Sequence, residues 1–188
     1  MEKLSKTKRI AIFVLTTIAS ILLARFAALT FSPAPGVITF YFAVAFMIAF
    51  TLWFGVWGAV AAYIGCVIGA GIPAGLPLPV NLYWSLADLW QVLIPLVVFA
   101  LLKADAALRT RRDYAVFLIF GWLLNNFVGA IWGAGMFVLS GQFHGSDFID
   151  LFANWFLTNL IVTIIITPLL LRFVTPYIKK KGLLIRKL

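Results

Sequence analysis

Six long apolar runs constrain this chain more than any other feature of its sequence. The apolar core of a bilayer is about 30 Å thick, and a helix needs roughly 20 mostly apolar residues to cross it. Runs that suit this length are residues 10–31, 37–54, 57–72, 81–102, 114–140 and 151–173. The sequence therefore predicts an all-α fold, in which residues 1–188 form one polytopic membrane domain of six transmembrane helices.

The amino-acid composition agrees with a bilayer as the solvent. The chain is 64% hydrophobic and 11% charged, whereas soluble domains average about 45–50% apolar and about 25% charged residues. A soluble protein this apolar would lack the polar side chains needed to cover its surface. We therefore expect a multi-pass protein of the inner, or cytoplasmic, cell membrane.

Proline and glycine mark the breaks after the first and third runs. These breaks are Ser32-Pro33-Ala34-Pro35-Gly36 and the segment 73–80, which holds Pro73, Gly75, Pro77 and Pro79. Proline has no N–H to donate and blocks helix continuation, so both segments are expected to be loops. Only Gly55-Val56-Trp57-Gly58 separates the short second and third runs, which predicts a tight helical hairpin.

The basic residues predict the orientation of the helices. Every Lys and Arg except Arg25 precedes the first run, joins the fourth run to the fifth, or lies from Arg172 onwards. The loops at 32–36, 73–80 and 141–150 contain none. Because Lys and Arg accumulate in cytoplasmic loops, both termini are predicted to be cytoplasmic. Topology and contact with anionic lipid then explain the net charge of +9, and we expect no nucleic-acid partner.

The start of the chain resembles a signal peptide, with basic residues before an apolar run. That run is long, however, so we expect the first helix to remain uncleaved.

Two ionisable residues lie deep in the predicted helices. Arg25 lies late in the first run and Asp88 lies early in the fourth. At a rise of about 1.5 Å per residue, both are on the order of 10 Å below the outer boundary. An unpaired charge in a span costs at least about 2.5–3.5 kcal/mol. We therefore expect both residues to face the interior of the bundle, and direct contact between them is a hypothesis.

Further polar and aromatic residues accompany Asp88 and point to a ligand pocket. Asn81, Trp84 and Gln91 recur around it at helical spacing, and similar side chains follow in the last run. The predicted substrate-binding residues are Arg25, Asn81, Trp84, Asp88, Gln91, Asn154, Trp155 and Asn159. An alternative stays open, because polar residues in membrane helices also hold helices together, and Trp often marks the membrane interface.

Groups suited to catalysis or metal binding are scarce. The chain has one cysteine, Cys66, and lacks a Gly-rich phosphate loop, a Cys/His cluster and a Ser/His/Asp order. His144, beside Asp147 and Asp150, is expected to be a solvated loop residue rather than a metal ligand. We predict no enzymatic activity, no cofactor and no bound metal.

Small residues form a separate pattern. Thr16, Ser20, Ala24 and Ala28 repeat every four residues in the first run. Two GxxxG matches follow, at residues 65–69 and 129–133. Such stripes allow two helices to approach closely. The partner helix is either in the same bundle or in another subunit.

Two stretches of sequence carry a resemblance to a known family. The first run holds Ala24-Arg25-Phe26-Ala27-Ala28, and the last reads NWFLTNLIVTIIITPLLL. With its size and topology, the chain resembles the S components of energy-coupling factor (ECF) vitamin transporters. This resemblance implies a subunit that binds a vitamin-like solute near the outer face. It also implies docking, through Ser20, Ala24 and Ala28, onto an ECF T subunit driven by ATPases.

A second resemblance concerns the TPLLL sequence at residues 167–171. It is similar to the end of the last helix in membrane-associated sensor regions that precede histidine kinase or cyclase domains. Because the sequence stops at Leu188, this resemblance implies a ligand-binding module that acts through a separate partner protein. The main functional prediction is thus a solute-binding subunit of an uptake transporter, and the alternative is a membrane sensor.

Overall fold

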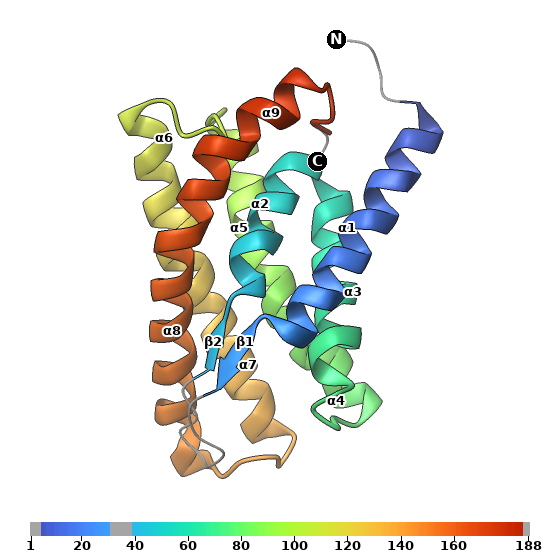
Figure 1. The fold of residues 1–188 in the computed structure, drawn as a ribbon. Coiled ribbons are helices and arrows are strands. Elements are labelled where there is room, and N and C mark those ends of the chain that lie inside the picture. Colours follow the sequence, from blue (N-terminus) through green and yellow to red (C-terminus); the bar gives the residue numbers. More distant parts are fainter. Residues whose placement is uncertain (1–4, 31–38, 186–188) are drawn as a thin grey trace.

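The computed structural model describes residues 5–30 and 39–185, and this part of the chain is almost entirely helical (Figure 1). Its elements in chain order are α1 (Lys6–Phe26), β1 (Ala28–Thr30), β2 (Thr39–Tyr41), α2 (Ala43–Phe54), α3 (Val56–Cys66), η1 (Val67–Gly71), α4 (Leu78–Trp84), α5 (Leu86–Leu101), α6 (Arg111–Val116), η2 (Phe117–Leu123), α7 (Leu124–Leu139), η3 (Gly145–Asp147), α8 (Phe148–Leu169), η4 (Leu170–Val174) and α9 (Thr175–Lys180). The η1, η2 and η4 segments are π-helical turns within longer helices, and η3 is a 3-10 turn.

Within the described residues, four helical stretches are long and apolar enough to cross a membrane. They are Lys6–Phe26, Leu78–Leu101, Arg111–Leu139 and Gly145–Lys180. The second and third predicted helices are shorter, at Ala43–Phe54 and Val56–Gly71. The all-α class and the membrane character are therefore confirmed. Six crossings and cytoplasmic termini stay predictions.

The predicted hairpin between the second and third runs forms at one residue. Gly55 alone separates α2 from α3, and its φ of 61° lies in the left-handed region that favours glycine. Its N–H donates to the Thr51 carbonyl, which closes the end of α2. The two helices of the hairpin then run back along each other with almost no connecting loop.

The short helix α2 lies at the centre of the bundle. Its residues from Ala43 to Ala49, apart from Phe46, are fully buried. It packs against α3, α5, α8 and α1, which surround it (Figure 1). A helix that is apolar on all sides can be buried on all sides, and this accounts for the sequence of α2, which is apolar except for Thr51.

A small strand pair replaces part of the helices predicted at 10–31 and 37–54. β1 and β2 are antiparallel, with Ala28 opposite Tyr41 and Leu29 opposite Phe40. Thr, Phe and Tyr favour extended backbone, which is the local reason that α2 begins only after Tyr41. The predicted loop at 32–36 lies outside the described residues.

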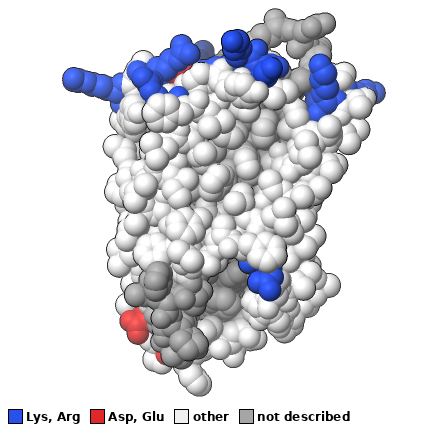
Figure 2. All heavy atoms as spheres, in the orientation of Figure 1, with Lys and Arg blue, Asp and Glu red and all other residues white. Residues whose placement is uncertain are grey.

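The surface divides into an apolar body and a charged end. Figure 2 shows most Lys and Arg side chains gathered at the end of the molecule where α9 lies in Figure 1. We call this the basic end. Large apolar side chains such as Leu15, Leu22 and Phe173 are exposed between the two ends. An apolar surface of this extent is expected for a protein surrounded by lipid.

Candidate functional site: polar clusters in the bundle

Asp88 lies inside the bundle, as the sequence predicts. It lies on α5 and is only 1% exposed. The Tyr41 hydroxyl donates a hydrogen bond to its Oδ2 atom over 3.0 Å. The strand pair thus has a role in the site, because β2 places Tyr41 against α5. Tyr41 was missed from the sequence, since nothing in its local pattern connects it with Asp88.

Arg25 does not share this interior position, which corrects the expectation for it. Its side chain is exposed and its guanidinium lies 5.4 Å from the ring centroid of Phe26. No ion pair or hydrogen bond joins it to Asp88, both of which are described residues. Ala24 faces Gly69 of η1, and the next residue along a helix points about 100° away. Arg25 and Asp88 were predicted at the same depth, but equal depth does not make both side chains face the interior of the bundle.

Asn81 is fully buried and links α4 to the end of the α3–η1 helix. Its Nδ2 donates to the Val67 carbonyl over 3.0 Å, and its Oδ1 accepts from the Ser85 hydroxyl over 3.0 Å. A Cβ at Gly71 would meet the Asn81 side chain at 1.8 Å. Only glycine at residue 71 leaves room for this amide.

Gln91 begins a buried chain of hydrogen bonds that joins three helices. Its Nε2 donates to Asn126 Oδ1 over 2.8 Å. The Asn126 Nδ2 in turn donates to Thr163 Oγ1 over 2.8 Å, and Thr163 Oγ1 donates to the Asn159 carbonyl over 2.6 Å. Asn125 adds a bond to the Gln91 carbonyl over 3.1 Å. Residues of α5, α7 and α8 are thereby fastened together.

Three polar atoms of this cluster have no hydrogen-bond partner among the described residues. They are Gln91 Oε1, Asn125 Oδ1 and Asn159 Nδ2. All three side chains are 1% exposed or less. A buried polar atom without a partner costs about 1–3 kcal/mol, and a ligand that bonded to these atoms would remove that cost.

Two of the predicted aromatic residues also come together. The Trp84 and Trp155 ring centroids are 5.6 Å apart, and Phe137 packs against both. Asn154 lies half-buried beside Trp155 on α8, and its carbonyl accepts from the Thr158 hydroxyl over 2.7 Å. Seven of the eight predicted binding residues thus lie on α4, α5 and α8, while Arg25 lies apart on α1.

The small-residue stripe of α1 packs within the chain. A Cβ at Gly65 would approach the Ser20 Cβ to 2.6 Å, and one at Gly69 would approach the Ala24 Cβ to 2.8 Å. Ser20 and Ala24 are buried by this contact, and Ala28 continues into β1. The surface that docking onto another subunit requires is therefore occupied by α3 and η1, which corrects the docking prediction for Ser20 and Ala24.

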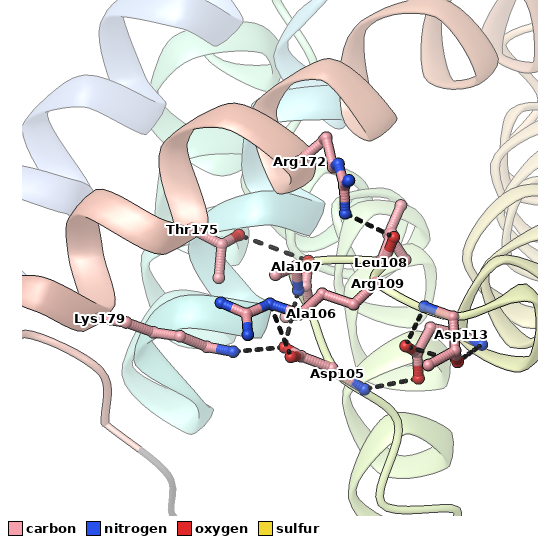
Figure 3. A network of polar contacts seen from close by, with 10 residues as sticks. Asp105, Ala106, Ala107, Leu108, Arg109, Asp113, Arg172, Thr175 and Lys179 are labelled. Carbon is pink, nitrogen blue, oxygen red and sulfur yellow. Dashed lines mark hydrogen bonds and ion pairs between the residues drawn. The ribbon is translucent and has the colours of Figure 1, made fainter.

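A second polar network, at the basic end, was not predicted (Figure 3). Asp105 accepts from Lys179 Nζ over 2.5 Å and from the Ala107 N–H over 2.9 Å. Arg172 donates to the Leu108 carbonyl over 3.3 Å. The loop between α5 and α6 is thereby attached to η4 and α9. In the sequence, the only sign of this network is the presence of acidic residues among the basic residues of the loop between α5 and α6.

These contacts lower the pKa of the Asp105 carboxyl. Partial burial by itself raises the pKa of this carboxyl. The hydrogen bonds from Lys179 and Ala107, with the charges of Lys179 and Arg109, outweigh that effect and hold the pKa of Asp105 below its ordinary value. Asp113 holds the other side of the loop, where its Oδ1 accepts from the Asp105 N–H and its Oδ2 from the Thr110 N–H.

The C-terminal segment is connected to α2 at this end. The Ile185 N–H donates to the Trp53 carbonyl over 2.9 Å, and Trp53 Nε1 donates to Thr175 Oγ1 over 2.9 Å. Both Trp53 and Ile185 are buried. α2 is therefore joined by hydrogen bonds to α9 and to the segment that follows it, up to Ile185.

Among the described residues, no three His, Cys, Asp or Glu side chains are grouped so that they could hold a metal ion. Comparison with models of protein families gives a match to MASE1 over residues 10–185, which is most of the chain. No curated protein matches the chain significantly, and no solved structure does so.

Proposed function

The chain belongs to the MASE1 family of membrane-integral sensor domains in signalling proteins, and we propose that it is a ligand-binding sensor module. In this proposal, a small molecule binds among α4, α5, α7 and α8. The resulting change reaches a signalling partner at the basic end. The family match over residues 10–185 is the observation that carries the proposal.

The match favours the sensor over the transport subunit. It gives no support to an ECF T subunit or to ATPases as partners. The intrachain contact of Ser20 and Ala24 with α3 and η1 agrees with this preference, because it covers the surface proposed for docking. We therefore propose a signalling protein as the partner of the basic end, and no catalytic step within this chain.

The buried polar cluster supports a ligand site within the bundle. Its unpartnered atoms, Gln91 Oε1, Asn125 Oδ1 and Asn159 Nδ2, offer two acceptors and one donor. A ligand that complements them would gain hydrogen bonds without displacing existing ones. The proposed site keeps Asn81, Trp84, Asp88, Gln91, Asn154, Trp155 and Asn159 of the predicted residues and omits Arg25, which is exposed.

Native mass spectrometry of the mildly purified protein tests the ligand site. We expect a retained small molecule in the wild type and its loss in Gln91→Leu, which removes the amide but keeps the side-chain volume similar. The matched control is Gln142→Leu, an exposed amide in the loop between α7 and η3. Equal retention in the two variants would contradict the proposed site.

Identification of co-purifying proteins tests the partner class. A tagged full-length chain is isolated from its native membranes in mild detergent, and bound proteins are identified. A histidine kinase, a cyclase or another signalling enzyme supports the sensor. A transmembrane T subunit together with ATPases would contradict it.

We also propose that the bundle crosses the membrane six times with the basic end in the cytoplasm. The twelve residues of α2 span about 18 Å. The three residues of β2 add about 10 Å, which brings this segment close to the thickness of a bilayer core. The lysines and arginines at the basic end support its cytoplasmic placement.

A further inference from the structure

A cavity of about 460 Å³ lies at the basic end, away from the ligand site proposed above. Its volume is within the range of about 300–1,000 Å³ that is usual for small-molecule sites. Leu96, Phe99 and Ile185, all buried, form part of its apolar wall. Lys103, Asp105 and Lys179 form its polar part. The lining of the cavity thus combines apolar and charged side chains.

The two lysines of this cavity differ in their bonding. Lys179 is held by Asp105 in the ion pair of the basic-end network (Figure 3). Lys103 is exposed, and its ammonium group makes no hydrogen bond or ion pair with any described residue. The cavity therefore holds one cation that is neutralised and one that is available to an anion.

The backbone at Lys103 is also unusual. Its φ of 52° lies in the left-handed region, where glycine is the common residue at the end of a helix. The Ala104 N–H donates to the Phe99 carbonyl over 3.0 Å, which is the bond that closes α5 in this way. Strained backbone persists mainly at functional positions. Lys103 and Leu108, with a φ of 49°, are the non-glycine residues with positive φ among the described residues, and of the two only Lys103 lines the cavity.

We propose that this cavity binds an amphiphile with an anionic head group. Lys103 binds the head group, and the apolar part lies against Leu96, Phe99 and Ile185. A phosphate group combined with an apolar chain has this chemistry, and anionic lipids are attracted to basic segments at membrane surfaces. Because the Ile185 N–H also donates to the Trp53 carbonyl, the ligand would contact the segment that joins α9 to α2.

Native mass spectrometry in a neutral detergent tests the site with defined probes. The protein is titrated with lysophosphatidic acid, with lysophosphatidylcholine of the same acyl chain, and with inorganic phosphate. We expect a one-to-one adduct with the anionic lipid and at least tenfold weaker binding of the zwitterionic one. Inorganic phosphate at millimolar concentration should not displace the lipid. Equal binding of both lipids, or displacement by phosphate alone, would overturn the proposal.

Lys103→Gly separates binding from folding. It removes the ammonium group and places glycine at the left-handed position, so the melting temperature should rise while affinity for the anionic lipid falls at least tenfold. Arg111→Gln is the matched control, because Arg111 is exposed at the same end but does not line the cavity. Ala100→Phe, at the cavity wall, should abolish the adduct by filling the space. Unchanged lipid affinity in both Lys103→Gly and Ala100→Phe would refute the site.

Discussion

At the scale of single residues, the bundle interior holds amides and a carboxyl where its sequence is otherwise apolar. Asn126 is the most connected of them, since it bonds with Gln91, Thr163 and the Trp122 carbonyl. Inside a bilayer, such a residue has no water to replace a lost partner. The contribution of Asn126 to the stability of the bundle therefore comes from its three hydrogen bonds.

Asn126→Ala should destabilise the bundle by about 1–3 kcal/mol, because it removes bonds from α7 to α5 and α8 and leaves their partners unsatisfied. Thermal unfolding in detergent measures the change. Ser146→Ala, at an exposed loop residue, is the control and should melt like the wild type. An unchanged melting temperature for Asn126→Ala would show that the amide network does not hold the helices together.

The lowered pKa of Asp105 predicts that the stability of the fold depends on pH. Its pKa is lowered in the folded protein, so its ionised form stabilises the fold above the ordinary pKa of an aspartate, about 4. This contribution is lost as pH falls through the lower folded pKa. Asp105→Asn should therefore melt below the wild type at pH 7, and the difference should shrink towards pH 3. A difference that stays constant over this range would contradict the assignment of stability to the Asp105 contacts.

At the scale of the helical elements, close approach of helices is set by glycine. α1 packs on α3 and η1 through Ser20 and Ala24, which face Gly65 and Gly69. The same small residues suit a contact between subunits, and nothing in their spacing distinguishes the two cases. The structure shows the intrachain contact.

Gly65→Ala should separate α1 from α3 and lower stability by about 1–3 kcal/mol, because its new methyl group would lie 2.6 Å from the Ser20 Cβ. Gly135→Ala is the matched control on α7, where no described atom beyond the neighbouring residues of its own helix lies within 4 Å of the added carbon. That variant should melt at or above the wild-type temperature, since alanine favours a helix. Melting curves in one detergent compare the two, and equal effects would argue against the α1–α3 contact.

The sequence predicts a structural element well when the residues that cause it lie within that element or next to it. Gly55 and the prolines act through their own backbone, so the hairpin and a break before α4 were predictable. The loop predicted at 73–80 is shorter in the structure, because α4 begins at Leu78 and accommodates Pro79 in its first turn. Asp88 and Gln91 share a helix face by spacing alone, and both are indeed buried. Tyr41 against Asp88 and Lys179 against Asp105 join residues far apart in the chain. Such pairings depend on how helices pack, which single-sequence patterns do not encode.

At the scale of the whole molecule, α5 extends from one polar region to the other. The buried cluster of α5, α7 and α8 lies in the bundle interior, and the basic-end network fastens η4 and α9 to the loop after α5. α5 contributes Gln91 to the buried cluster and Phe99 to the cavity at the basic end. A ligand that shifts α5 would change the contacts of the basic end, which is the behaviour that a sensor module requires.

Cysteine labelling tests the orientation of the molecule in the membrane, because the chain has a single native cysteine. The native Cys66 is buried, so it should react little with a membrane-impermeant maleimide. A cysteine replacing exposed Ser146, in the loop between α7 and α8, should be labelled on intact cells. A cysteine replacing exposed Arg111, at the basic end, should be labelled only after the cells are opened. Because Lys and Arg are retained on the cytoplasmic side, the reverse pattern would contradict both the orientation and a signalling partner at the basic end.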